Sequence, residues 1–230
     1  MEAIELSEYI IAKHDSVGEP ITNMKLQKLL YYVETWALVH IGSIIEEEFE
    51  AWIHGPVIPK VYSHYKKFGY SPISIFYPNN DPNASEFIKV FERKHIDNGI
   101  NSYTFKLIAD VLNEYGELNA FQLENLTHSE EPWLNARKDF LFNEQSNNII
   151  SKKEMKEYYI KLTKEDEDYG FNNTDEIIFN PYITVKDPTK ITKKDLGARA
   201  QIVMEHIELG ECTTIKTQED SDRFWKQFGI

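Results

Sequence analysis

Cysteine is nearly absent from this chain of 230 residues, and Cys212 is its only example. One cysteine excludes an internal disulfide and a cysteine-based zinc cluster. The first residues lack the basic start and small-residue cleavage site of a signal peptide, and no apolar run approaches the roughly 20 residues that a membrane-spanning helix needs. We therefore expect a cytoplasmic protein without a membrane partner.

Positive charge is also scarce. The chain has 25 Lys and Arg residues against 38 Asp and Glu residues, which gives a formal net charge of -13 and a pI near 5.0. Affinity for nucleic acid comes largely from clustered Lys and Arg, so we expect no direct nucleic-acid partner. A basic protein partner fits this charge better.

The motifs of common enzyme classes are missing as well. The sequence contains no Gly-rich phosphate loop, no Ser-centred nucleophile elbow and no paired acidic motif for two metal ions. We therefore predict a binding protein, without enzymatic activity, cofactor or metal.

What the chain does contain is a series of helical patterns. Thr22 stands at an N-cap position, apolar side chains then recur at helical spacing over 26–41, and Gly42 offers a left-handed stop. Residues 49–53 alternate as in a short strand, and Pro56 or Pro59 can begin the helix that follows. Further helices are predicted over 4–14, 102–115, 119–126, 132–141 and 151–162, with Ser102 as the cap of the second and Asn119 with Gln122 as a capping box for the third. Residues 84–93 fit either a helix or a strand, with helix preferred.

A charged, polar stretch over 164–170 has the composition of a linker and marks a predicted domain boundary. The first domain, residues 1–168, is expected to be mainly α (α+β) with a short β component. Residues 169–230 are expected to form a small α/β unit of βαβα order, whose thin core would dock on the first domain or on a partner.

Two groups of side chains are candidates for contact with a partner. Lys25, Lys28 and Tyr32 fall three or four residues apart beside the apolar face of the 26–41 helix, so we expect them to point together toward solvent or a partner. At the other end of the chain, an exposed aromatic cluster is predicted from Phe224, Trp225 and Phe228.

The stretch that runs from Trp52 through His54, Gly55 and Pro56 has two interpretations. His54 could act as a general base at a strand end. Alternatively, Gly55 supplies an unusual backbone angle, Pro56 starts a helix, and His54 bonds to the neighbouring backbone. We favour the structural interpretation.

A second stretch, LTHSEEPW, contains His128, Glu130, Pro132 and Trp133. His128 and Glu130 could join His54 as metal ligands, since imidazole and carboxylate bind zinc or iron. No second His stands four residues away to form a pair on one helix face. We therefore expect His128 to hold together a helix junction that Pro132 and Trp133 anchor.

The stretches ITNMKLQKLLYY, EAWIHGPVIPKVY and LTHSEEPW, in this order and spacing, resemble the Panacea domain, the SocA-type antitoxin domain of phage-associated proteins. The resemblance covers the predicted first domain and leaves the C-terminal unit outside. Because these stretches include Lys25, Lys28 and Tyr32, it strengthens the expectation that they contact a partner.

The resemblance implies an antitoxin that inhibits a cognate toxin protein by direct binding. In some relatives the antitoxin is also an adaptor that delivers the toxin to a cellular protease. Two other hypotheses remain open. One is a metal-dependent hydrolase that uses His54, His128 and Glu130, and the other is a phage-derived regulatory interaction protein without a toxin.

Overall fold

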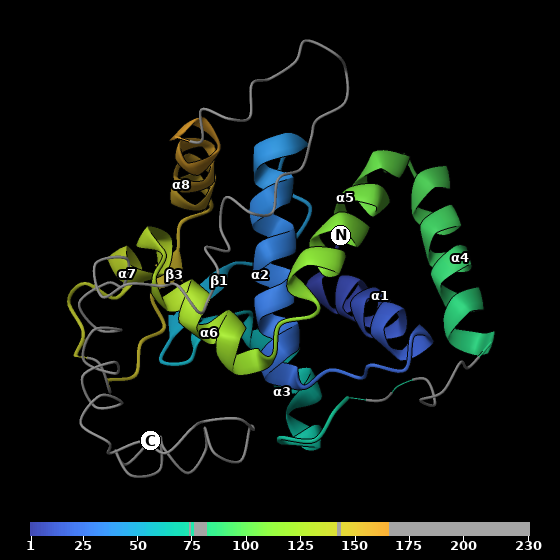
Figure 1. Ribbon diagram of the computed structural model, residues 1–230, viewed down its shortest axis with the longest axis horizontal. Coiled ribbons are helices and arrows are strands. Elements are labelled where there is room, and N and C mark those ends of the chain that lie inside the picture. The colour runs from blue at the N-terminus through green and yellow to red at the C-terminus, as the bar shows by residue number, and fades with distance from the viewer. Residues whose placement is uncertain (74, 76–81, 142–143, 166–230) are drawn as a thin grey trace.

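The structure is a computed structural model, and it describes residues 1–73, 75, 82–141 and 144–165. Within these residues the fold is mainly helical with one small antiparallel sheet, which confirms the predicted α+β class (Figure 1). The predicted C-terminal unit with Phe224, Trp225 and Phe228 lies outside the described residues, and so does the boundary predicted after residue 168.

The helices are α1 (Ala3–Ser16), α2 (Asn23–His40), α3 (Pro59–Tyr65) with a 3-10 turn (Lys66–Phe68), α4 (Pro82–Asp97), α5 (Ser102–Tyr115), α6 (Ala120–His128), α7 (Glu131–Ala136) and α8 (Lys152–Glu165). The strands are β1 (Phe49–Trp52), β2 (Gly55–Val57) and β3 (Ile149–Ile150).

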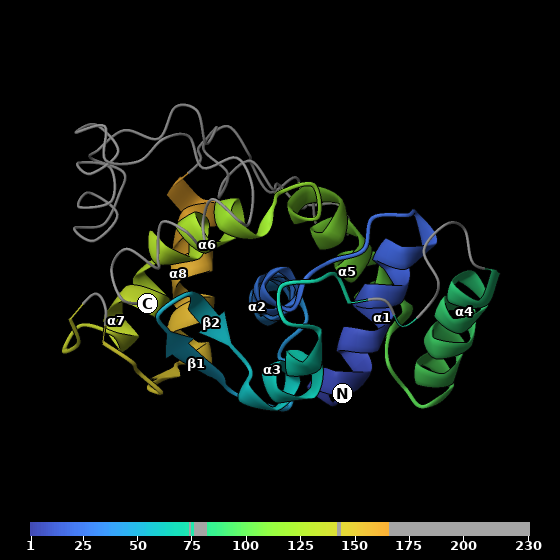
Figure 2. The same cartoon turned by 90° about the horizontal axis from the view of Figure 1, so that it is seen from below.

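Helix α2 forms the centre of the fold. Figure 1 shows it upright between α8 and α5, and Figure 2 looks along its axis. It packs against α1, α3, α5, α6, α8 and β2. Its ends match the prediction, because the Thr22 hydroxyl accepts a hydrogen bond from the Lys25 N–H at 3.2 Å and Gly42 has φ +96°. A helix enclosed in this way must bury polar side chains as well as apolar ones.

The sheet has the order β2-β1-β3, and both pairs are antiparallel. The predicted strand at 49–53 is present as β1. Pro56 does not begin a helix, because it lies in β2, an edge strand, where its missing N–H costs no ladder bond. Pro59 instead occupies the first turn of α3. Strand β3 is only two residues long and was not predicted.

The remaining helix predictions differ from the structure in detail. The ambiguous segment 84–93 belongs to α4. The side chain of Asn101, one residue before the expected Ser102, caps α5 by accepting a hydrogen bond from the Tyr103 N–H. The predicted capping box is present at α6, where Asn119 and Gln122 each accept the other's backbone N–H at 2.9 Å.

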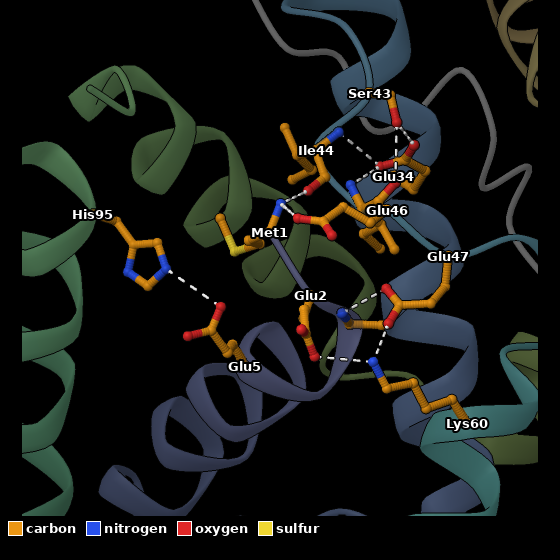
Figure 3. Close-up of polar contacts among 12 residues, drawn as sticks. Met1, Glu2, Glu5, Glu34, Ser43, Ile44, Glu46, Glu47, Lys60 and His95 are labelled. Carbon is orange, nitrogen blue, oxygen red and sulfur yellow. Dashed lines mark hydrogen bonds and ion pairs between the residues drawn. The ribbon is translucent and has the colours of Figure 1, made fainter. Parts of the chain in front are cut away.

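Polar contacts fasten the loop that follows α2 (Figure 3). The buried Glu34 carboxylate accepts the N–H groups of Ile44 and Ile45 at 3.0 and 2.9 Å, and the Ser43 hydroxyl also donates to it. Lys152, at the start of α8, lies 3.2 Å from the same carboxylate. Glu34 therefore ties this loop and α8 to the central helix.

None of the helices in the described residues is both long enough and apolar enough to cross a membrane.

Candidate functional site

Lys28 lies where the three stretches that resemble the Panacea domain come together in the fold. Its side chain comes from α2 and donates a hydrogen bond from Nζ to the Pro56 carbonyl oxygen at 3.2 Å. The residue is only 1% exposed. The expectation that Lys28 faces solvent is therefore wrong, because β2 and α6 cover this side of α2.

Gly55 sits directly against the Lys28 side chain. It has φ +96°, a conformation that side-chain-bearing residues rarely adopt. A Cβ atom at this position would lie 2.7 Å from Lys28 Nζ and 2.8 Å from the hydroxyl oxygen of Thr127. The turn between β1 and β2 can approach α2 and α6 this closely because residue 55 has no side chain.

His54, the residue of this turn that directly precedes Gly55, pairs with Glu124 of α6. The distance between His54 Nδ1 and Glu124 Oε1 is 2.8 Å. The His54 side chain is 38% exposed, whereas that of Glu124 is 1% exposed. His128 approaches the same oxygen to 3.9 Å, and its ring stacks on Trp133 with 4.1 Å between centroids. Two histidines from different stretches therefore converge on one buried carboxylate.

The charges of this first cluster, formed by Lys28, His54, Glu124 and His128, balance one another. Burial alone would raise the pKa of Glu124, but the His54 hydrogen bond and nearby positive charge lower it, so the carboxylate is ionised. Burial lowers the pKa of Lys28 to about 8, against the influence of Glu124. Burial also lowers the pKa of His128 to about 3, so this imidazole is neutral at pH 7.

A second cluster surrounds Glu130. Its carboxylate accepts hydrogen bonds from the hydroxyl groups of Tyr31, Tyr32 and Tyr159 at 2.9, 3.0 and 2.8 Å. Burial raises the pKa of Glu130 to about 7, although the three tyrosines act in the opposite direction. Tyr32 is completely buried, so the expectation that it faces solvent is also wrong. This cluster connects α2 and α8 through the residue that precedes α7.

The three residues of the hydrolase hypothesis therefore fall in two clusters. His54 and His128 approach Glu124, while Glu130 faces the tyrosines. Among the residues that the structure describes, no group of three His, Cys, Asp or Glu side chains is arranged to hold a metal ion. Lys28 and His54 bond to Pro56 and Glu124, and three tyrosine hydroxyl groups bond to Glu130. Glu124 Oε2 and His128 Nε2 have no hydrogen-bond partner among the described residues.

Trp133 joins the later stretch to the sheet. Pro132 begins α7, and the Trp133 indole N–H donates to the Trp52 carbonyl oxygen at 3.0 Å. The buried Arg137 donates to the Ala51 carbonyl oxygen at 2.8 Å. These two side chains fix β1 against α7.

Lys25 differs from its neighbours on α2. It is half-buried, and Nζ donates to the Gly116 carbonyl oxygen at 2.5 Å at the end of α5. Burial lowers its pKa. The predicted line of Lys25, Lys28 and Tyr32 therefore does not form a common exposed surface.

Sequence reasoning missed Glu124, which is the centre of the first cluster. A signal was present, because Glu124 and His128 are separated by four residues and so share one face of a helix. The contact of His54 with Glu124 could not be predicted from spacing, since 70 positions separate them.

The first cluster and most of the second lie within the region of similarity to known proteins, and Tyr159 of α8 lies outside it. Residues 26–134 match the family model described as "Antitoxin SocA-like, Panacea domain". Over 63 residues the chain is 38% identical to Antitoxin SocA of Caulobacter vibrioides (strain NA1000 / CB15N), an alignment that covers 27% of this chain and 34% of that protein. The chain thus spans about a third of the length of this curated relative. No solved structure matches.

The matched region contains Lys28, His54, Glu124, His128 and Glu130. It leaves out α1 and α8, although both pack on α2. The resemblance drawn from the three sequence stretches is confirmed by the match of residues 26–134 to the SocA-like Panacea domain model.

Proposed function

We propose that this protein is an antitoxin that neutralises a cognate toxin protein by direct binding. The observation that carries the proposal is the match of residues 26–134 to an antitoxin-like domain. The partial relative named Antitoxin SocA points to the same role.

The arrangement of the buried clusters supports a role in binding. Lys28, Glu124 and Glu130 have their strongest contacts with other residues of the fold. The stretches that define the domain therefore hold a scaffold together, and partner contact is left to surface side chains. Such a scaffold can accept different exposed residues without refolding, which lets related domains bind different partners.

The C-terminal residues 169–230 supply, in this proposal, target-specific surface through Phe224, Trp225 and Phe228. A chain that ends at Gly170 tests this part alone. Loss of neutralisation with the domain still folded would support it. Full neutralisation by the shortened chain would show that residues 171–230 are dispensable.

Co-expression with the product of the neighbouring gene tests the central proposal. The neighbouring gene alone should stop growth, and the full chain should restore it and co-purify with its product. If cells that express the neighbouring gene alone grow normally, its product is not a toxin. This result would favour a regulatory interaction protein without a toxin.

The mechanism of neutralisation has two forms that toxin abundance separates. If the chain is an adaptor, the toxin level falls when the chain is present and recovers when the cellular protease is removed. If the chain blocks the toxin by binding alone, growth recovers while the toxin level stays constant.

A catalytic alternative draws on the His54–Glu124 pair, because a half-exposed histidine oriented by a buried carboxylate is an arrangement used in general-base catalysis. Elemental analysis of the purified protein tests its metal-dependent version. Stoichiometric zinc or iron would favour a hydrolase over a binding protein.

A further inference from the structure

The small sheet has one buried face, and its other face reaches solvent at β1 and β3, while Val57 of β2 is buried there. On β1, Phe49 and Ala51 are buried, whereas Glu50 and Trp52 are half-buried. Glu50 is paired with Ile149 of β3, so the two side chains share the outer face, and Ile149 is 52% exposed. Figure 2 shows the sheet at the margin of the fold, with α7 on one side and α3 on the other.

Trp52 is held in a fixed orientation on this outer face. Its indole N–H donates to Glu50 Oε2 at 2.7 Å. Its ring meets the Tyr62 ring of α3 at 66°, with 4.9 Å between the centroids. Its carbonyl oxygen accepts the Trp133 hydrogen bond, which also fixes the backbone. An aromatic ring fixed in this way loses little entropy when it binds a partner.

The charge of this face is negative. Glu50 lies beside the indole, and Glu48 is exposed immediately before β1. Glu46, also exposed, is paired with the N-terminal ammonium of Met1 at 3.5 Å. An aromatic ring attracts a cation to its face, and an adjacent carboxylate can form charge-assisted hydrogen bonds with the same cation. Arginine suits this pair better than lysine, because its planar guanidinium can stack on a ring while its edge bonds to a carboxylate.

We propose that the outer face formed by Glu50, Trp52, Tyr62 and Ile149 binds a basic segment of a partner protein. An arginine of that segment stacks on Trp52 and pairs with Glu50, and an apolar side chain next to it contacts Ile149. The identity of the partner as the cognate toxin rests on the proposed function. The recognition chemistry itself rests on the geometry of this face.

A short peptide tests the recognition chemistry without the toxin. The full chain, labelled with ¹⁵N at the tryptophan indoles, is titrated with acetyl-Gly-Arg-Ile-Gly-amide, and the Trp52 signal is identified by its loss in Trp52→Phe. The Trp52 signal should shift in a saturable manner. A peptide with citrulline in place of arginine should bind up to about five-fold more weakly, as expected for loss of one exposed ion pair.

Two variants sharpen this experiment. Glu50→Gln should weaken binding of the arginine peptide about five-fold. Glu86→Gln, which changes an exposed glutamate on α4, should leave it unchanged. Equal binding of the arginine and citrulline peptides, or shifts confined to other indoles, would overturn the proposal.

Co-expression separates this proposal from the proposed function. Glu50→Lys reverses the charge of the face and should abolish neutralisation, while Glu86→Lys should not. If wild-type chain fails to neutralise the neighbouring gene product, the toxin is not the partner and the peptide result stands alone. If Glu50→Lys neutralises as well as wild type, the outer face is not the toxin-binding surface.

Discussion

His54 and Glu124 are 70 positions apart in the chain, yet their side chains share a hydrogen bond of 2.8 Å. The imidazole is partly exposed and the carboxylate is not. A surface residue of the β1–β2 turn is thus fixed by a charge in the interior. This pair, with Lys28 beside it, makes the turn dependent on α6.

Replacing Glu124 should be among the most destabilising single changes in the domain. Glu124→Gln removes the negative charge that faces Lys28 and His54, and loss of one member of a buried charge pair costs about 3 kcal/mol. Chemical denaturation at pH 7 measures the loss, with Glu117→Gln on the exposed loop before α6 as the control. A loss below about 0.5 kcal/mol would show that the pair contributes little.

The effect of Glu124→Gln should also depend on pH. The pKa of Glu124 is lower in the folded protein than its ordinary value of 4.5. Its stabilising contribution is therefore fully present above pH 4.5 and disappears as the pH falls through the folded pKa. The stability difference between wild type and variant should shrink in this acidic range.

Gly55→Ala tests how closely the turn approaches Lys28 and Thr127. The change introduces both backbone strain and a clash, and together these should cost about 3 kcal/mol. Gly42 is a matched control, because it has the same φ of +96° and nothing within 4 Å of an added Cβ. Gly42→Ala should therefore cost only about 1 kcal/mol. Thermal or chemical denaturation measures the loss of stability in each variant. If Gly55→Ala and Gly42→Ala lose the same free energy of unfolding, the interior accommodates the methyl group at residue 55.

Titration of Lys28 should change the stability of the fold at alkaline pH. Its folded pKa of about 8 lies below its ordinary value of 10.5, so the charged form destabilises the fold and this penalty is relieved as the pH rises from 8 toward 10.5. Between pH 8 and pH 10, wild type should gain about 2 kcal/mol relative to Lys28→Met. Lys106→Met, at an exposed position of α5, should show no such gain. If the stability of wild type and of Lys28→Met changes with pH in the same way, the pKa of Lys28 is not lowered in the folded protein.

The pKa of Glu130 is shifted in the opposite direction from that of Glu124, so its contribution to stability should have the opposite pH dependence. Its folded pKa of about 7 lies above its ordinary value of 4.5, so its contribution to stability is present below pH 4.5 and is lost as the pH rises through 7. Wild type should lose roughly 3 kcal/mol relative to Glu130→Gln across this range. The neighbouring Glu131, which is exposed, provides the control Glu131→Gln. A carboxyl ¹³C signal of Glu130 that titrates near 4.5 would refute this prediction.

Local sequence signals predicted the ends of several helices correctly. Thr22 and Gly42 bound α2, and Asn119 with Gln122 opens α6, because caps depend on residues a few positions apart. Strand β3 was not predicted because two residues show no alternation. Pro56 and Pro59 were both offered as the start of a helix, and local sequence could not show that Pro56 belongs to an edge strand, where proline is equally suited.

The buried polar residues could not be predicted from local spacing. Lys28 and Tyr32 lie on a polar line that normally faces solvent. Their partners, Glu124 and Glu130, come about a hundred positions later, so nothing in the α2 sequence indicates that the line is enclosed. Periodicity identifies an apolar face, but it cannot show that other elements also cover the opposite side.

Glu130 connects Tyr31 near the start of the chain with Tyr159 near the end of the described domain. During synthesis the first of these tyrosines leaves the ribosome long before the last is made. The hydroxyl groups of α2 can therefore meet Glu130 before α8 is made, whereas the third hydrogen bond has to wait for Tyr159. A chain whose translation stops before Tyr159 lacks one of the three hydroxyl groups that hold the buried Glu130 carboxylate, so we expect it to be less stable and more open to cellular proteases.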